Sequence, residues 1–443
     1  MNCYPPQTMK LRFTLFALIG PGMLVAATGV GAGDLATAGF AGSKLGLAII
    51  WAVPLGAFLK FVLNEGLARW QLATGQTLLE GAMVHFGWPL KILFLLYFLP
   101  WSFFTGAALI SACGVTMHAM IPLFEDDAQA RLVFGIAHSL VGVIIAWGGG
   151  FKWFGRIMGV CIGIMFVAVI TTAIMLRPDL SQLMSGLLRP TIPQFSAGGL
   201  TWTIALFGGV GGTLTVLCYG YWIREAGRTG PDDLRICRID LVAGYIMIAL
   251  FGMGMIIIAN GIELQGKGAG LIVSLADRIQ ETAGNTGRWI FLIGAWTAVF
   301  SSLLGVWQAV PYLFADYCSM LRTKSGPESA PGVKVIDTRA MPYRIFLLAL
   351  AIIPLLQVTK PFEDVQKYYA ILGAAFIPFL AALLLVMNSR TKWVGARHRN
   401  RWLTVVILVV VLLLSCLAGV VEIRKKWAPD KPVADHAAHT ISN

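Results

Sequence analysis

The sequence predicts an all-α polytopic membrane protein with about eleven transmembrane helices: two five-helix repeats and one extra helix. Of its 443 residues, 57% are hydrophobic and only 13% are charged, about half the charged fraction of an ordinary soluble domain. A single globular core stops growing near 250–300 residues, so it could not bury this much apolar surface. The apolar residues also form long uncharged runs, two of which carry similar glycine clusters.

The apolar runs define the expected spans, because a helix crosses the hydrocarbon core in roughly 20 residues. The uncharged run from Phe13 to Gly33 exceeds the 7–15 residues typical of a signal peptide, so we interpret it as a membrane helix. The expected spans are 13–38, 45–67, 92–117, 132–150, 156–176, 199–222, 240–260, 289–314, 344–358, 367–387 and 403–421. The corresponding parts are a tail (1–12), two repeats (13–190 and 191–389), a basic loop with the extra helix (390–423), and a second tail (424–443).

The basic residues predict the orientation of the chain. Loops on the side of the N-terminus hold 20 of the 34 Lys and Arg residues, and loops on the other side hold nine. Cytoplasmic loops are enriched in Lys and Arg, so we expect a cytoplasmic N-terminus in an inner or plasma membrane of bacterial type. We therefore attribute the net charge of +12 to the orientation of the chain in a lipid bilayer, and we expect no nucleic-acid partner. No sequence pattern specifies an oligomeric state.

Two expected spans carry glycine clusters near their middle. The first contains Gly-Val-Gly at 29–31, and the sixth contains it at 209–211, five spans later. Each glycine costs a helix about 1 kcal/mol relative to alanine. Small residues also serve close helix packing, which stays open as an alternative. The repetition favours two discontinuous helices from inverted halves, whose freed carbonyls and helix ends line a central site.

A carboxylate follows the first cluster. An acidic side chain within a span is costly unless it is paired or hydrated, and no Lys or Arg lies near Asp34 in sequence. A cation is therefore its natural partner, although Asp34 could also serve as the N-cap of the second half of the first span. Oxygen ligands suit Mg²⁺, Mn²⁺ or Ca²⁺. The candidate ligands are the Asp34 carboxylate, the hydroxyls of Thr28, Thr213 and Thr215, and freed carbonyls such as that of Gly31.

Other charged groups have more ordinary interpretations. We expect Lys60, inside the second span, to snorkel or to pair with a carboxylate. Arg224 and Glu225, with Asp232 and Asp233 nearby, form either a solvated loop or an inner gate. The sequence has no nucleotide-binding P-loop and no H-E-x-x-H motif, which argues against an ATP-driven pump, an enzyme or a bound cofactor.

Several motifs together resemble one known family. They are Gly20-Pro21-Gly22-Met23-Leu24, Gly33-Asp34-Leu35-Ala36-Thr37, Ala41-Gly42, Leu67-Ala68-Arg69, Thr74-Gly75-Gln76-Thr77-Leu78-Leu79-Glu80 and, more loosely, Asn388-Ser389-Arg390 with Gly395. The chain resembles a divergent member of the natural resistance-associated macrophage protein (Nramp) family of divalent-metal transporters. The resemblance implies a LeuT-like fold of two inverted five-helix repeats, with the first and sixth spans unwound around a metal ion.

The sequence departs from that family where the metal would bind. The family's Asp-Pro-Gly-Asn appears as Gly31-Ala32-Gly33-Asp34, and its Met-Pro-His falls at about Val216-Leu217-Cys218. Cys218 could supply a soft ligand or serve as core filler. Magnesium-transporting relatives also depart at these two motifs, so Mg²⁺ is a candidate substrate. The third span carries no acidic residue over Trp101–Gly106, which predicts transport without the family's usual proton coupling.

We therefore expect a transporter of divalent cations of the Mn, Fe or Mg class, working by alternating access with the ion as substrate. A transporter of an amino acid or another small organic solute on the same fold is the alternative. In that case a helix N-terminus would hold the carboxylate of the solute and Asp34 its amine. A membrane-embedded scaffold or sensor is disfavoured by the central carboxylate and the paired helix breaks.

Overall fold

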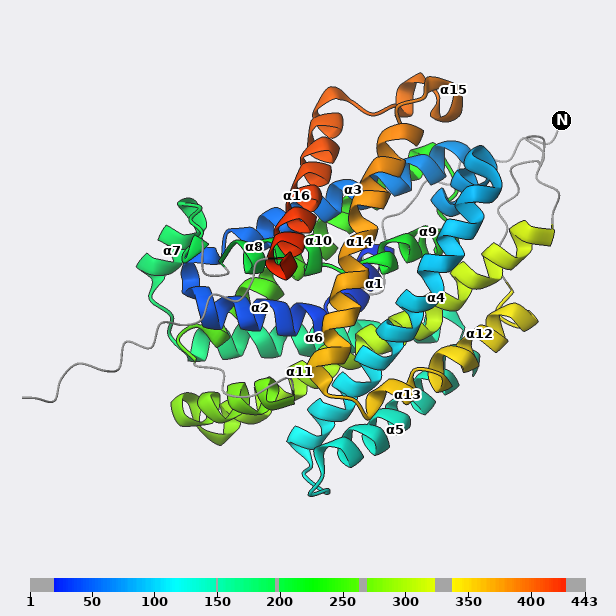
Figure 1. Ribbon diagram of the computed structural model, residues 1–443. Coiled ribbons are helices and arrows are strands. Elements are labelled where there is room, and N and C mark those ends of the chain that lie inside the picture. The colour runs from blue at the N-terminus through cyan, green and yellow to red at the C-terminus, as the bar shows by residue number, and fades with distance from the viewer. Residues whose placement is uncertain (1–19, 149, 196–198, 263–268, 323–336, 428–443) are drawn as a thin grey trace, which may run out of the picture.

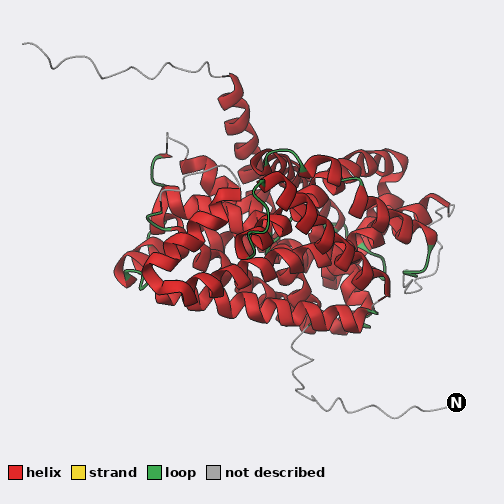
Figure 2. Cartoon of the chain, turned by 90° about the horizontal axis from the view of Figure 1, so that it is seen from below, coloured by secondary structure: helices red, strands yellow, loops and turns green. Residues whose placement is uncertain are grey.

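The computed structural model describes residues 20–148, 150–195, 199–262, 269–322 and 337–427 (Figure 1). Over these ranges the regular structure is helical and no strand occurs, as Figure 2 also shows. The predicted all-α class is therefore confirmed. The expected tail 1–12 and residues 428–443 of the second tail lie outside the described residues.

The chain forms sixteen α-helices and several short 3₁₀ turns within the described ranges. The α-helices are α1 (Pro21–Gly29), α2 (Ala32–Leu45), α3 (Ala52–Thr74), α4 (Leu78–Met120), α5 (Asp127–Gly148), α6 (Phe151–Met175), α7 (Leu180–Leu188), α8 (Gly199–Gly209), α9 (Cys218–Glu225), α10 (Leu234–Ala259), α11 (Ala269–Arg322), α12 (Met341–Ile352), α13 (Leu355–Val358), α14 (Phe362–Met387), α15 (Thr391–Val394) and α16 (Trp402–Trp427). The 3₁₀ turns are η2 (Gly46–Ile49), η4 (Leu214–Leu217), η5 (Pro231–Asp233) and η6 (Ala396–His398).

Every expected span overlaps a helix, and residues 13–19 of the first span lie outside the described residues. Where both ends are described, at least one of them is shifted from its expected position. Within the described residues, seven helices and one bent pair, α1 with α2, are long and apolar enough to cross a membrane. A shorter apolar helix covers Trp402–Leu417. The second expected span begins later than predicted, because Gly46 (φ +64°) ends α2 and a 3₁₀ turn precedes α3. The crossing of the membrane by α3 and by the pair α8–α9 stays a prediction.

The longest helices are interrupted. In α4 the backbone leaves helical geometry at Gly87 (φ +67°), and Pro89 follows two residues later. In α11 the same happens at Gly284 (φ +69°). The third and eighth expected spans, 92–117 and 289–314, correspond to the long segments that follow these kinks.

The helix pair α1–α2 lies in the middle of the bundle, against α6, α8, α10 and α11 (Figure 1). Its start is fixed on α10 by the Gly-Pro-Gly motif. The backbone amide of Gly22 donates to Asp240 at 2.7 Å. A Cβ on Gly22 would lie 2.3 Å from the Asp240 carbonyl oxygen, and one on Gly244 would lie 2.3 Å from the Gly22 oxygen. Glycine is needed on both helices because their backbones touch.

Candidate cation site between two broken helices

The first expected helix break is present. The segments on either side of it are bent by 57°. Val30 and Gly31 have extended backbone angles between α1 and α2. The carbonyl of Gly31 accepts from the amide of Leu35 at 3.0 Å and so begins the second segment.

The second break is present as well. Helix α8 ends at Gly209, and the chain continues through η4 before α9 begins at Cys218. Gly211 (φ +81°) and Gly212 (φ +84°) adopt left-handed backbone conformations. These conformations disfavour residues with a Cβ, which explains the consecutive glycines. The prediction of two discontinuous helices is therefore confirmed.

The two breaks touch each other. A Cβ on Gly29 would lie 2.9 Å from the carbonyl carbon of Gly211, and one on Gly212 would lie 3.3 Å from the Cα of Gly29. The two interpretations of the glycine clusters, close packing and helix interruption, thus apply together. Side chains next to the breaks therefore face backbone N–H and C=O groups that take no part in helical hydrogen bonds.

Asp34 points across this contact. It is 5% exposed, and its Oδ1 accepts from the backbone amide of Gly211 at 3.1 Å. The N-cap of α2 is Gly31, so the alternative role of Asp34 as an N-cap is wrong. Instead Asp34 lies in the first turn of α2, where the positive end of the helix dipole favours a carboxylate.

A buried ammonium group reaches the second break from α3. Lys60 is 1% exposed, its Nζ donates to the carbonyl of Gly212, and its charge interacts with that of Asp34. Sequence reasoning looked for a basic residue near Asp34 along the chain and so assigned a free cation instead. The tertiary structure adds a cation of the protein itself, because it brings the ammonium group of Lys60 to the second break. The assignment of a metal ion to Asp34 stays a prediction. The expectation that Lys60 pairs with a carboxylate stays a prediction, since its hydrogen bond at this break goes to the Gly212 carbonyl.

The predicted threonine ligands occupy different positions. Thr213 lies in the second break, and its hydroxyl accepts from the indole N–H of Trp101 at 3.1 Å. The hydroxyl of Thr215 lies beside Gly212, 2.5 Å from where a Cβ would be. Both are at most 9% exposed. They belong to the same break as the Gly212 carbonyl, which accepts from Lys60.

Thr28 and Gly31 face another neighbour, α11. The Thr28 hydroxyl packs against Gly305, where a Cβ would lie 1.9 Å from its oxygen. The carbonyl of Thr28 accepts from Ser302 at 2.7 Å, and a Cβ on Gly31 would also meet Ser302. These two residues support the first break from α11.

Cys218 is fully buried at the start of α9. Over the described ranges, no three His, Cys, Asp or Glu side chains gather closely enough to hold a metal ion. The charged part of the site is therefore one carboxylate and one ammonium group, surrounded by oxygen acceptors.

Three polar residues were missed by sequence reasoning. Asn64 donates to the Tyr245 hydroxyl at 2.9 Å, and the Tyr245 ring lies 3.2 Å from where a Cβ on Gly211 would be. The Tyr369 ring lies next to Gly33 in the same way, at 3.0 Å. Asn64 follows Lys60 by one helical turn, so this polar helix face was the signal that could have revealed it.

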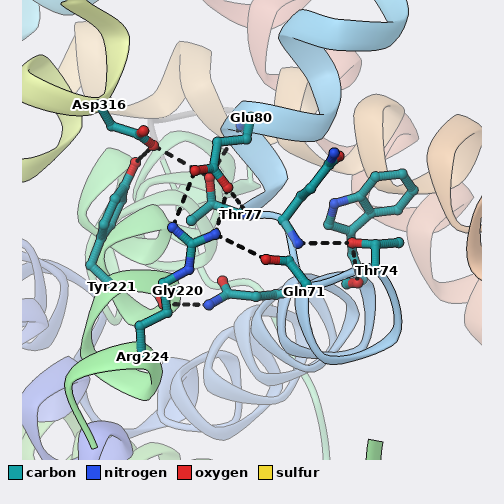
Figure 3. Close-up of polar contacts among 11 residues, drawn as sticks. Gln71, Thr74, Thr77, Glu80, Gly220, Tyr221, Arg224 and Asp316 are labelled. Carbon is teal, nitrogen blue, oxygen red and sulfur yellow. Dashed lines mark hydrogen bonds and ion pairs between the residues drawn. The ribbon is translucent and has the colours of Figure 1, made fainter. Parts of the chain in front are cut away.

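A second polar cluster lies at the far end of α9 (Figure 3). The Arg224 guanidinium donates to both carboxylate oxygens of Glu80, at 2.5 and 3.2 Å. The Tyr221 hydroxyl donates to Asp316 at 2.6 Å, and Gln71 donates to the Gly220 carbonyl at 2.6 Å.

We call these contacts the α9 network, because they join α9 to α3, α4 and α11. Of the residues expected in an inner gate, Arg224 belongs to the network, whereas Asp232 is exposed and the Asp233 carboxylate accepts from the amides of Thr229 and Gly230 in its own loop. The role of the network as a gate stays a prediction.

Comparisons with known proteins agree with this architecture. The family model described as natural resistance-associated macrophage protein-like matches residues 22–423. A search of curated protein sequences gave no match. A manganese transporter from Eremococcus coleocola is similar in structure, with a TM-score of 0.73 and 15% identity over 97% of this chain and 91% of that one.

Another similar structure is MhsT in complex with L-phenylalanine, with a TM-score of 0.61 and 13% identity over 91% of this chain and 97% of that one. These similarities confirm the LeuT-like fold, and the match to the family model does not favour the organic-solute alternative. Because that model covers most of its length, the chain belongs to the Nramp family of divalent-metal transporters and is a transporter rather than an enzyme.

Proposed function

We propose that the chain carries a divalent cation across the membrane by alternating access, with the cation bound between the two breaks. The observation that carries this proposal is the position of Asp34, a buried carboxylate directed at the backbone of the second break. The Gly212 carbonyl and the Thr213 and Thr215 hydroxyls supply further oxygens at that break.

The chemistry of these groups favours a hard ion. Carboxylate, carbonyl, hydroxyl and water oxygens suit Mg²⁺ and Mn²⁺, whereas the thioether of the family motif is missing from this sequence. We therefore propose Mg²⁺ or Mn²⁺, carried with part of its hydration shell, as the substrate.

Lys60 gives the site a feature of its own. Its ammonium group contacts the Gly212 carbonyl and offsets the charge of Asp34, so the pair has no net charge to attract a dication. We propose that the transported ion takes the place of the ammonium group when it binds. Lys60 would then act as a tethered competitor that occupies the site in the absence of substrate.

Uptake into proteoliposomes tests the proposal. Asp34→Asn keeps the size of the side chain but removes its charge, and we expect it to lower saturable Mg²⁺ or Mn²⁺ uptake at least tenfold. Asp179→Asn is the control, because that carboxylate lies at the exposed N-cap of α7, and we expect it to transport like the original protein. Absence of saturable flux for every divalent ion would reject the proposal.

A further inference from the structure

A cavity of about 600 Å³ opens between α3, the start of α10 and the segment that leads into α16. It shares no residue with the site at the helix breaks. Its polar wall carries six arginines against two carboxylates: Arg69, Arg235, Arg238, Arg397, Arg399 and Arg401 against Glu65 and Asp232. Such an excess of positive charge in one cavity indicates an anionic ligand.

The carboxylate of Glu65 is already used within the protein. It accepts from Arg238 at 2.7 Å and lies 3.4 Å from Arg69. Arg69 also donates to the side chain of Asn400 at 2.8 Å, so it fixes the loop before α16 rather than binding a ligand.

The other four arginines are available. Over the described part of the chain, no carboxylate lies within 4 Å of the guanidinium groups of Arg235, Arg397, Arg399 or Arg401, and all four side chains are exposed. They converge on the cavity from α10 and from the loop before α16.

The remaining wall of the cavity is apolar. Phe58 on α3 and Leu403 on α16 line it and are 47% and 54% exposed. Ile407, one turn beyond Leu403, continues this wall along α16. A small soluble anion would leave this apolar wall without a contact. A phospholipid could place its phosphate against the arginines and its acyl chains against the apolar wall. Basic pockets between transmembrane helices on the cytoplasmic side bind anionic headgroups in this way.

We propose that this cavity binds an anionic phospholipid, with the phosphate held by Arg235, Arg399 and Arg401 and an acyl chain lying against Phe58 and Leu403. The cavity lies on the side that the basic loops predict as cytoplasmic. The bound lipid would bridge α3 and α16. This inference does not depend on the identity of the transported ion.

The test uses the purified full chain with phosphatidylglycerol or phosphatidylcholine in mixed micelles. Lipid retained by the protein is counted by native mass spectrometry. We expect at least tenfold preferential retention of phosphatidylglycerol. The double variant Arg399→Gln/Arg401→Gln should lose that preference, and so should the single variant Arg235→Gln on a different helix.

The control variant Arg189→Gln/Arg278→Gln removes the same number of charges outside the cavity and should keep the preference. Equal retention of the two lipids by the original protein, or unchanged preference in both cavity variants, would overturn the proposal. Competition with inorganic phosphate shows whether the arginines bind a lipid headgroup or a soluble phosphate. Displacement of phosphatidylglycerol by millimolar phosphate would overturn the assignment to a lipid.

Discussion

The substitution Glu80→Gln gives the most direct test of the α9 network as a gate. Glu80 has two roles: its carboxylate pairs with Arg224, and it also accepts from the Thr77 amide at 2.6 Å in a capping box at the start of α4. Glutamine preserves such a cap. The substitution therefore removes the ion pair and leaves the start of α4 intact.

The expected magnitude follows from the burial of the pair. The side chains of Arg224 and Glu80 are 6% and 17% exposed, and loss of one partner from a buried pair costs about 3–5 kcal/mol. The amide oxygen of glutamine can still accept one bond, so we take about 3 kcal/mol. If the network forms only while this end of the bundle is closed, the loss shifts the equilibrium towards the open form by roughly 100-fold.

Labelling of Cys218 measures that shift. Cys218 is fully buried one turn before Tyr221 on α9, a residue of the network, and residues three apart share a helix face. In a chain whose other cysteines are replaced by serine, a membrane-impermeant maleimide applied from the predicted cytoplasmic side should label Cys218 at least tenfold faster in Glu80→Gln.

A variant with a similar chemical change controls the experiment. Glu281→Gln breaks the pair with Arg278, whose side chains are 64% and 57% exposed, and exposed pairs contribute little. Its labelling rate should match that of the original protein. A rate in Glu80→Gln within twofold of the original would refute the reasoning about the gate.

Three further perturbations address the site and its supports. Lys60→Met removes the tethered charge, so the dissociation constant for Mn²⁺ measured by calorimetry should fall at least tenfold, while Lys60→Arg should not lower it. Gly211→Ala places a Cβ at φ +81°, which costs roughly 1–2 kcal/mol and should lower both thermal stability and uptake; unchanged values would mean that the break tolerates a side chain. Gly244→Val pushes α10 off α1 at Gly22 and should destabilise the protein more than Gly163→Val, where nothing lies within 4 Å.

Much of the architecture could be predicted from local sequence patterns. Runs of apolar residues specify transmembrane helices, because unpaired backbone groups are costly in lipid. The repeated Gly-Val-Gly marked both breaks. At the second break glycine is needed, because the left-handed conformations of Gly211 and Gly212 disfavour residues with a Cβ. Asp34 stood out because a carboxylate inside an apolar run has to be paired.

The extension of α3 to Thr74, beyond the expected end at residue 67, was less predictable. The charged residues Lys60, Glu65 and Arg69 lie within that helix and are nevertheless buried. Hydropathy treats each charge as a reason to end a span, and it contains no information about the ion pair of Glu65 with Arg238 that accompanies their burial.

The sequence by itself determined the membrane class, the helical content, the two breaks and the acidic residue beside the first of them. Only the tertiary structure decided that Lys60 reaches the second break, that Thr28 faces α11, and that Glu80 pairs with Arg224. The physical reason is the distance along the sequence over which each interaction acts. Helix breaks and apolar spans depend on neighbouring residues, whereas each of these contacts joins separate helices and exists only once those helices have packed.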